Sequence, residues 1–119
     1  MPHFVIEYAR EVGQQIDLSK LLEVTHQVGA SSGLMMPEDI KVRAHPYDNY
    51  KMQGTNDTFV HTTIFLLEGR TDEEKEKLSI TLRSEQAKLM PSVTSISIDI
   101  RDMKDITYKK RLLPSEQQI

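Results

Sequence analysis

The feature that most constrains the fold is a strand–helix–strand pattern that occurs twice, over residues 2–52 and 58–101. Each half has an apolar, β-branched run, then apolar residues at helical spacing, then a second extended run. One half contains too few apolar residues to bury a core alone, so the two halves must fold together. We therefore predict one α/β (α+β) domain over residues 1–119. Its tandem βαβ repeat forms a four-stranded mixed sheet with two helices on one face, and residues 102–119 form a tail.

The first half begins with an apolar strand at residues 2–8, followed by a polar connection at residues 9–16. Asp17 suits the N-cap of the next helix, which should end near the small and glycine residues at 29–33. Residues 40–45 then alternate between apolar and polar side chains, which indicates a strand with one buried face.

The second half contains the strongest strand signal, at residues 58–67, which are nearly all β-branched, aromatic or apolar. This composition predicts a central strand. Thr71 and Glu74 form a capping-box pattern for a helix over residues 71–90, and residues 93–101 alternate as a final strand. A single layer of helices leaves the other face of the sheet open. We predict that this face packs against other subunits.

The composition excludes several classes of protein. A net charge of −3 argues against a protein whose main function is to bind the phosphate backbone of a nucleic acid, although a local basic pocket could hold a small anion. The absence of cysteine excludes thiol catalysis and thiolate metal sites. No apolar run approaches the roughly 20 residues of a membrane span, and no secretory signal is evident. We expect a cytoplasmic protein that binds neither nucleic acid nor membrane.

Pro2 directly follows the initiator methionine. Removal of Met1 would make the Pro2 nitrogen a secondary amine at the head of a buried strand. A free α-amino group has a pKa of about 7.7–8.0, and nearby cations or an apolar wall lower it. Such an amine could act as a general base near neutral pH. The alternative is that the Met1-Pro2 start affects only how the N-terminus is processed and has no catalytic role.

Several short segments together have the order and spacing of a known family. They are Pro2-His3-Phe4, Glu7-Tyr8, Arg43-Ala44-His45, Asp48, Tyr50, Phe59-Val60-His61 and Gly69-Arg70. With these segments the chain resembles the 5-carboxymethyl-2-hydroxymuconate isomerase family of the tautomerase superfamily. The turn over residues 67–75 also resembles that of the 4-oxalocrotonate tautomerase type.

The resemblance implies a reaction and an assembly. Members of the superfamily use the amino-terminal proline to move a proton within a conjugated oxo- or hydroxy-acid, without a cofactor. The implied substrate is a small anion, 5-carboxymethyl-2-hydroxymuconate or a close relative, from homoprotocatechuate breakdown in aromatic catabolism. The resembling members are homotrimers whose sheets wrap a central core.

The resemblance also assigns roles to basic residues. Pro2 would be the base, and Arg70 would hold a substrate carboxylate with two parallel hydrogen bonds, unless it is a solvated loop arginine. Lys41 occupies a position where the family has arginine. A lysine keeps the positive charge but lacks the planar guanidinium that can bind a carboxylate with two parallel hydrogen bonds. This difference leaves the identity of the substrate open. Arg43 would supply a second cation or a structural ion pair with Glu7.

Other interpretations of the sequence remain open. The four histidines match no tight ligand spacing, so we predict no metal site. A different proline-dependent reaction, such as hydration or dehalogenation of an unsaturated acid, needs a water-activating acid, for which Glu7 is close in sequence. If Met1 is retained, the Pro2 nitrogen is an amide, and the chain would be a non-catalytic oligomeric binding module.

Overall fold

The computed structural model describes residues 1–113, so the last part of the predicted tail, residues 114–119, lies outside the described residues. The strands and helices along the chain are β1 (His3–Ala9), α1 (Arg10–Gln15), α2 (Leu18–Ser31), the short 3-10 helix η1 (Pro37–Asp39), β2 (Lys41–Tyr47), β3 (Phe59–Leu67), α3 (Asp72–Leu89) and β4 (Ser95–Met103).

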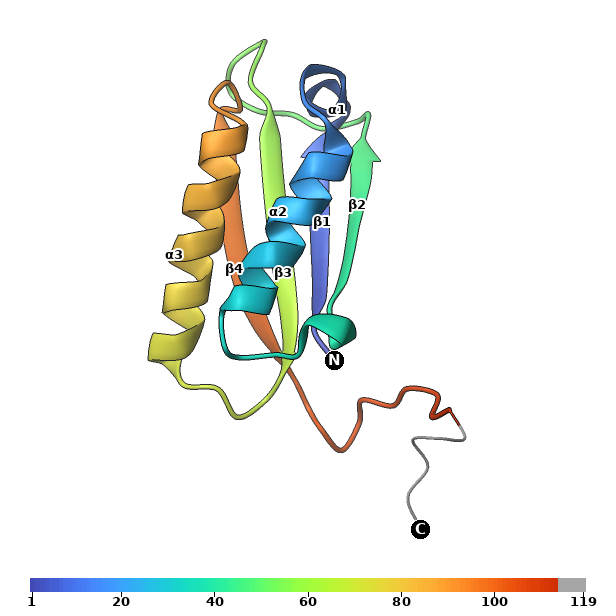
Figure 1. Cartoon of the computed structure of the whole chain (residues 1–119). Coiled ribbons are helices and arrows are strands. Elements are labelled where there is room, and N and C mark those ends of the chain that lie inside the picture. The colour runs from blue at the N-terminus through green and yellow to red at the C-terminus, as the bar shows by residue number, and fades with distance from the viewer. Residues whose placement is uncertain (114–119) are drawn as a thin grey trace.

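The strands form one mixed sheet in the order β2-β1-β3-β4. β1 pairs with β2 in parallel, β3 pairs with β4 in parallel, and the two central strands β1 and β3 are antiparallel. Helices α2 and α3 lie side by side on one face of the sheet (Figure 1). This arrangement confirms the predicted tandem βαβ repeat and the central position of the strand over residues 58–67.

The two faces of β1 have different surroundings. Phe4 and Ile6 are fully buried on the face that the helices cover. His3, Val5 and Glu7 alternate with them on the opposite face and remain half-buried. Because every other residue of a strand points to the same side, the period of the sequence determines which residues reach the uncovered face.

A close approach of α2 to the sheet is possible because residue 29 is glycine. A Cβ atom at Gly29 would lie 2.9 Å from Cζ of Phe4, 3.1 Å from Cδ1 of Ile40 and 3.2 Å from Sδ of Met35. The helix can therefore lie directly over the head of β1. Gly29 is inside α2 and does not end it. The helix ends at Ser31, and Gly33 follows with a φ of +78°, a conformation that suits glycine.

Both main helices begin at the predicted caps. The Asp17 carboxylate accepts a hydrogen bond from the backbone N–H of Ser19 (2.9 Å). At α3, the Thr71 hydroxyl accepts from the Glu74 N–H (3.1 Å), and the Glu74 carboxylate accepts from the Thr71 N–H (2.8 Å). This reciprocal pair is the capping box predicted from the sequence.

One buried polar cluster joins the two halves of the repeat. The Gln86 side-chain amide on α3 donates to the hydroxyl of Thr25 on α2 (3.3 Å) and to that of Thr62 on β3 (3.1 Å). All three residues are fully buried. A buried donor without an acceptor would cost stability, so these hydrogen bonds fix how α2 and α3 sit over β3.

The structure differs from the sequence prediction in three places. The polar connection over residues 9–16 contains the helix α1, which buries Val12. β2 continues through Pro46 to Tyr47, which is compatible with proline because β2 is an edge strand. β4 spans Ser95–Met103, so it starts and ends two residues later than predicted.

Candidate functional site

The amino terminus lies at the end of a central strand. Pro2 is buried, and its carbonyl accepts a hydrogen bond from the backbone N–H of Lys41 (3.1 Å), which ties the head of β1 to β2. Met1 is half-buried, and the marked amino terminus lies beside η1 (Figure 1). This part of the chain is therefore held in place.

Charged side chains surround this amine. Burial lowers the pKa of the Met1 amine, and the positive charges of Lys41, Arg70 and Lys110 lower it further. The negative charge of Asp39 acts in the opposite direction. The amino terminus therefore lies in a positive environment that favours a neutral amine and attracts anions.

Arg70 follows β3 and contacts backbone of both halves. Its Nη1 donates to the carbonyl of Leu67 (3.0 Å) and its Nη2 donates to the carbonyl of Leu34 (2.6 Å). The side chain is partly buried, so it is not the solvated loop arginine considered above. Gly69 before it has a φ of +122°, which lets the chain turn out of β3 and bring the guanidinium back toward the amino terminus.

Lys41 and Arg43 lie on the uncovered face of β2, two residues apart, and both are exposed. The Lys41 ammonium contacts the carbonyl of Asp39 (3.3 Å). Arg43 donates from Nη1 to Nδ1 of His3 (3.1 Å). The alternative considered for Arg43, an ion pair with Glu7, is not formed, because Glu7 lies further along β1 and accepts a hydrogen bond from the Tyr47 hydroxyl.

The segment after β4 also reaches this end of the sheet. The hydroxyl of Tyr108 lies 2.9 Å from Nε2 of His3, and the two rings meet edge to face at 5.9 Å. The sequence analysis did not place residues 104–113 at the site. The charged residues around Tyr108 form no motif that indicates a site, and the contact of Tyr108 with His3 joins residues 105 positions apart.

The predicted site residues are thus only partly brought together. The charges of Lys41 and Arg70 act directly on the amine at Pro2's end of the chain. Arg43 is connected to the same end through His3. Asp39 and Lys110 are additional charged neighbours that the sequence analysis missed.

The remaining histidines have local partners. His26 donates from Nε2 to the carbonyl of Pro37 (3.1 Å), and His61 shares a hydrogen bond with the Ser97 hydroxyl (2.6 Å). His45 packs edge to face against Tyr47. Across residues 1–113, no group of three or more histidine, aspartate or glutamate side chains is arranged to hold a metal ion.

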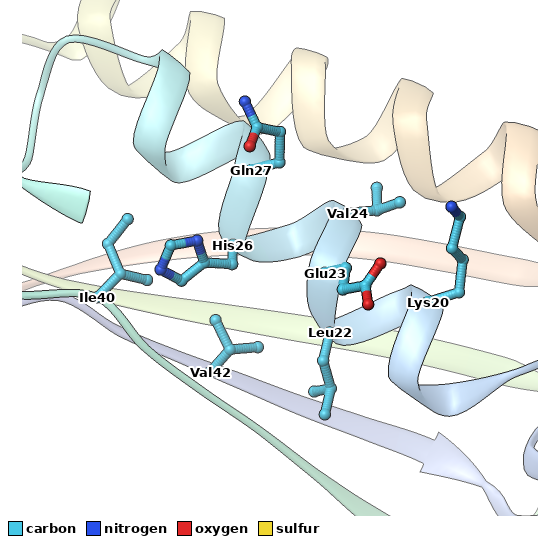
Figure 2. Close-up of a pocket in the computed structure, with 8 residues that line it drawn as sticks. All are labelled: Lys20, Leu22, Glu23, Val24, His26, Gln27, Ile40 and Val42. Carbon is cyan, nitrogen blue, oxygen red and sulfur yellow. The ribbon is translucent and has the colours of Figure 1, made fainter. Parts of the chain in front are cut away.

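A separate groove of about 740 Å³ lies between α2 and β2 and contains none of the predicted site residues. Figure 2 shows the His26 ring pointing from the helix toward Ile40, and Lys20 and Glu23 of the same helix also line the groove. None of the helices in the described part of the chain is long and apolar enough to cross a membrane.

Comparison with solved structures identifies the fold. A 5-carboxymethyl-2-hydroxymuconate isomerase from Deinococcus radiodurans R1 superposes with a TM-score of 0.81 at 20% identity, covering 92% of this chain and 88% of that chain. A fused 4-OT symmetric trimer superposes with a TM-score of 0.77 at 18% identity, covering 92% and 93%. At these identities the likeness concerns the fold.

Sequence comparison identifies the family. The 5-carboxymethyl-2-hydroxymuconate Delta-isomerase of Escherichia coli is 28% identical over 110 residues, which is 87% of each chain. The family model for 5-carboxymethyl-2-hydroxymuconate isomerase matches residues 2–112. The matched region begins at Pro2 and includes Lys41, Arg43, Arg70 and the segment that carries Tyr108. The chain therefore belongs to the 5-carboxymethyl-2-hydroxymuconate isomerase family and is an isomerase.

Proposed function

We propose that this isomerase moves a proton within an unsaturated 2-hydroxy or 2-oxo di- or tricarboxylate, without a cofactor. The first candidate substrate is 5-carboxymethyl-2-hydroxymuconate, which the family name carries. Pro2, exposed as the amino terminus by removal of Met1, is the general base. The supporting observation is that burial and the charges of Lys41 and Arg70 lower the pKa of the Met1 amine, one residue before Pro2 at the head of β1.

The chemistry follows from this environment. A neutral proline nitrogen removes a proton from the substrate, which leaves a delocalised dienolate and a protonated amine. The same amine then returns the proton to a different carbon, so the reaction is balanced within the site. Arg70 binds a carboxylate through the N–H groups that its two carbonyl contacts leave available, and Lys41 stabilises the developing oxyanion as a point charge. Arg43 contributes charge from the neighbouring position on β2.

The proposed active assembly is a homotrimer. The uncovered face of the sheet presents half-buried side chains, including Val5 on β1 and Phe65 on β3, which none of the helices within residues 1–113 covers. The fused 4-OT structures of the same fold are trimers. Packing three such faces together would remove this apolar area from water.

The proposal is tested by mass spectrometry and an isomerisation assay. The intact mass of the purified protein reports whether Met1 is absent. The ketonisation of 5-carboxymethyl-2-hydroxymuconate is then followed for the wild type, for Pro2→Ala, and for a form with a retained N-terminal tag. We expect Pro2→Ala and the tagged form to lose most turnover while their circular dichroism spectra are unchanged. Full turnover by either variant would exclude Pro2 as the base.

A second reaction is the hydration of an unsaturated acid. Glu7 is five residues from Pro2 along an extended strand, about 16 Å away. Asp39 is a better placed acid, because its charge acts on the amine. Hydration of a haloacrylate at a rate comparable to ketonisation, lost in Asp39→Asn, would favour this reaction. The family assignment disfavours the third interpretation, a non-catalytic binding module.

A further inference from the structure

The segment after β4 folds back against the amino terminus of its own chain. The N–H of Asp105 donates to the Glu68 carboxylate (3.0 Å), and the N–H of Tyr108 donates to the Lys104 carbonyl (2.9 Å). These contacts form a turn that presents the Tyr108 ring to His3. The charge of Lys110, two residues later, acts on the amine itself. Residues 104–110 therefore border the candidate site.

The direction of the hydrogen bonds at His3 follows from Arg43. A guanidinium only donates, so Nδ1 of His3 must accept the 3.1 Å hydrogen bond from Arg43. Burial lowers the pKa of His3, and the charges of Arg43 and Lys41 lower it further, so the ring is neutral at pH 7. A neutral imidazole with an accepting Nδ1 carries its proton on Nε2.

The state of Tyr108 follows in turn. Nε2 of His3 donates across 2.9 Å to the phenolic oxygen, and this leaves the hydroxyl proton of Tyr108 available to another acceptor. Within residues 1–113, His3 is the one hydrogen-bond partner of this hydroxyl. A hydroxyl oxygen that already accepts a hydrogen bond becomes a stronger donor, because such chains polarise one another.

We propose that Tyr108 contacts the substrate, donating its hydroxyl proton to an anionic oxygen of the molecule held beside the amino-terminal proline. His3 is the positioning residue that orients this hydroxyl, and Arg43 fixes the tautomer of His3. The inference rests on the proposed function, since it concerns the same anionic substrate. This inference gives the segment after β4 a role in contacting the substrate, which the composition of the segment alone does not indicate.

The first test removes one oxygen atom. Tyr108→Phe keeps the ring that packs on His3 and deletes the hydroxyl. We expect kcat/KM to fall by about a hundred-fold or more, as when a donor to a developing oxyanion is removed, with only a small decrease in melting temperature from the lost hydrogen bond to His3. The matched control is Tyr50→Phe. The Tyr50 hydroxyl bonds Glu11 (2.9 Å), and its ring packs on Phe59, at the other end of β3. It should retain wild-type kcat/KM.

The second test asks whether His3 acts through Tyr108. If it does, His3→Leu and Tyr108→Phe each lower kcat/KM, and the double variant is no worse than the more damaging single variant. His3→Gln, whose amide can supply an N–H donor in place of Nε2, should recover part of the loss. If the two decreases in kcat/KM multiply in the double variant, His3 does not act through Tyr108, and the two substitutions have independent effects.

A binding measurement separates this inference from the proposed function. Muconate, an unsaturated dicarboxylate, is titrated calorimetrically into wild type, Tyr108→Phe and Tyr50→Phe. Weaker binding or slower turnover in Tyr108→Phe alone supports the contact. Wild-type binding and wild-type turnover in Tyr108→Phe would overturn it, even where Pro2→Ala is inactive. Absence of ketonisation by the wild type would instead count against the proposed function, and the titration would still report on Tyr108.

Discussion

Arg70 has a structural role, and the proposed function gives the same side chain a chemical one. Its two carbonyl contacts join the end of β3 to the loop at Leu34, which belongs to the other half of the repeat. The same contacts hold the guanidinium at a fixed place beside the amine. A positioned cation loses less conformational freedom when it binds an anion than a mobile surface arginine does. The structural contacts therefore favour substrate binding.

Arg70→Lys tests both roles at once. A lysine head cannot reach two carbonyls and also offer a flat pair of donors to a carboxylate. We expect kcat/KM to fall about ten- to a hundred-fold and the free energy of unfolding to fall by about 1–2 kcal/mol. Arg83→Lys, at an exposed position of α3, is the control and should change neither quantity. Full activity in Arg70→Lys would show that the planar fork is not needed.

The charges around the amine predict opposite shifts in a pH profile. The base must be neutral to react, so kcat/KM rises with pH as the amine deprotonates. Burial and nearby cations lower the pKa of the Met1 amine, and the Pro2 amine would meet the same surroundings once Met1 is removed, so the midpoint of this rise should lie below the pKa of the same amine in water. Removing a cation in Lys41→Met should move the midpoint up. Removing the opposing anion in Asp39→Asn should move it down. Midpoints that shift in the same direction in both variants would contradict this electrostatic account.

At the scale of the elements, the position of β1 depends on α2. Phe4 follows His3 and lies beneath Gly29, so the packing of the helix fixes the strand that carries the proline. Loop residues alone would hold such a site less precisely than a strand in the centre of a sheet does. The absence of a side chain at residue 29 is thus linked to the geometry of the site.

Gly29→Ala should destabilise the protein despite the better helix propensity of alanine. The substitution gains about 1 kcal/mol of propensity, and the new Cβ would lie 2.9 Å from the fully buried Phe4 ring, an overpacking that costs about 1–3 kcal/mol. We expect a lower melting temperature and lower activity, measured by thermal unfolding and the ketonisation assay. Ser31→Ala, at an exposed position of the same helix, should not lower the melting temperature. A Gly29→Ala variant more stable than the wild type would show that the helix can move away.

The elements were predictable where a local pattern determines them. The alternation in β2 and the Thr71–Glu74 capping box each involve residues close in sequence, and the structure confirms both. Helix α1 was missed because Val12 is its one buried residue and Gly13 follows it. The contacts of His3 with Arg43 and Tyr108 join residues 40 and 105 positions apart, so no local pattern carries them. The predicted role of Pro2 came from the chemistry of an amino-terminal amine together with the family resemblance, and that of Lys41 came from the resemblance.

At the scale of the whole molecule, the face of the sheet opposite α2 and α3 is the main surface that lacks a packing partner within residues 1–113. Val5 and Thr63 are register partners in the two central strands, and both point to this face. A homotrimer would bury them. A charge at this place would have to be desolvated on assembly, which is costly unless it finds a partner.

Thr63→Lys should therefore dissociate the proposed trimer. Thr63 does not point into the helix-covered core, so the monomer should stay folded with a native circular dichroism spectrum. Analytical ultracentrifugation should report three times the mass of one chain for the wild type and the mass of one chain for the variant. Ile80→Lys, on the outer side of α3 where the residue is 49% exposed, is the matched control and should remain trimeric. A trimeric Thr63→Lys would place the interface elsewhere.

The buried hydrogen bonds of Gln86 also bear on how the molecule comes apart. A tandem repeat could in principle melt one unit at a time, as solenoid repeats do when their neighbours are weakly coupled. Here an amide from the second unit is shared between hydroxyls of both units. If one unit opened alone, the Gln86 amide would lose an acceptor without gaining full access to water. The two units should therefore unfold in a single calorimetric transition, and neither is expected to persist as an isolated fragment.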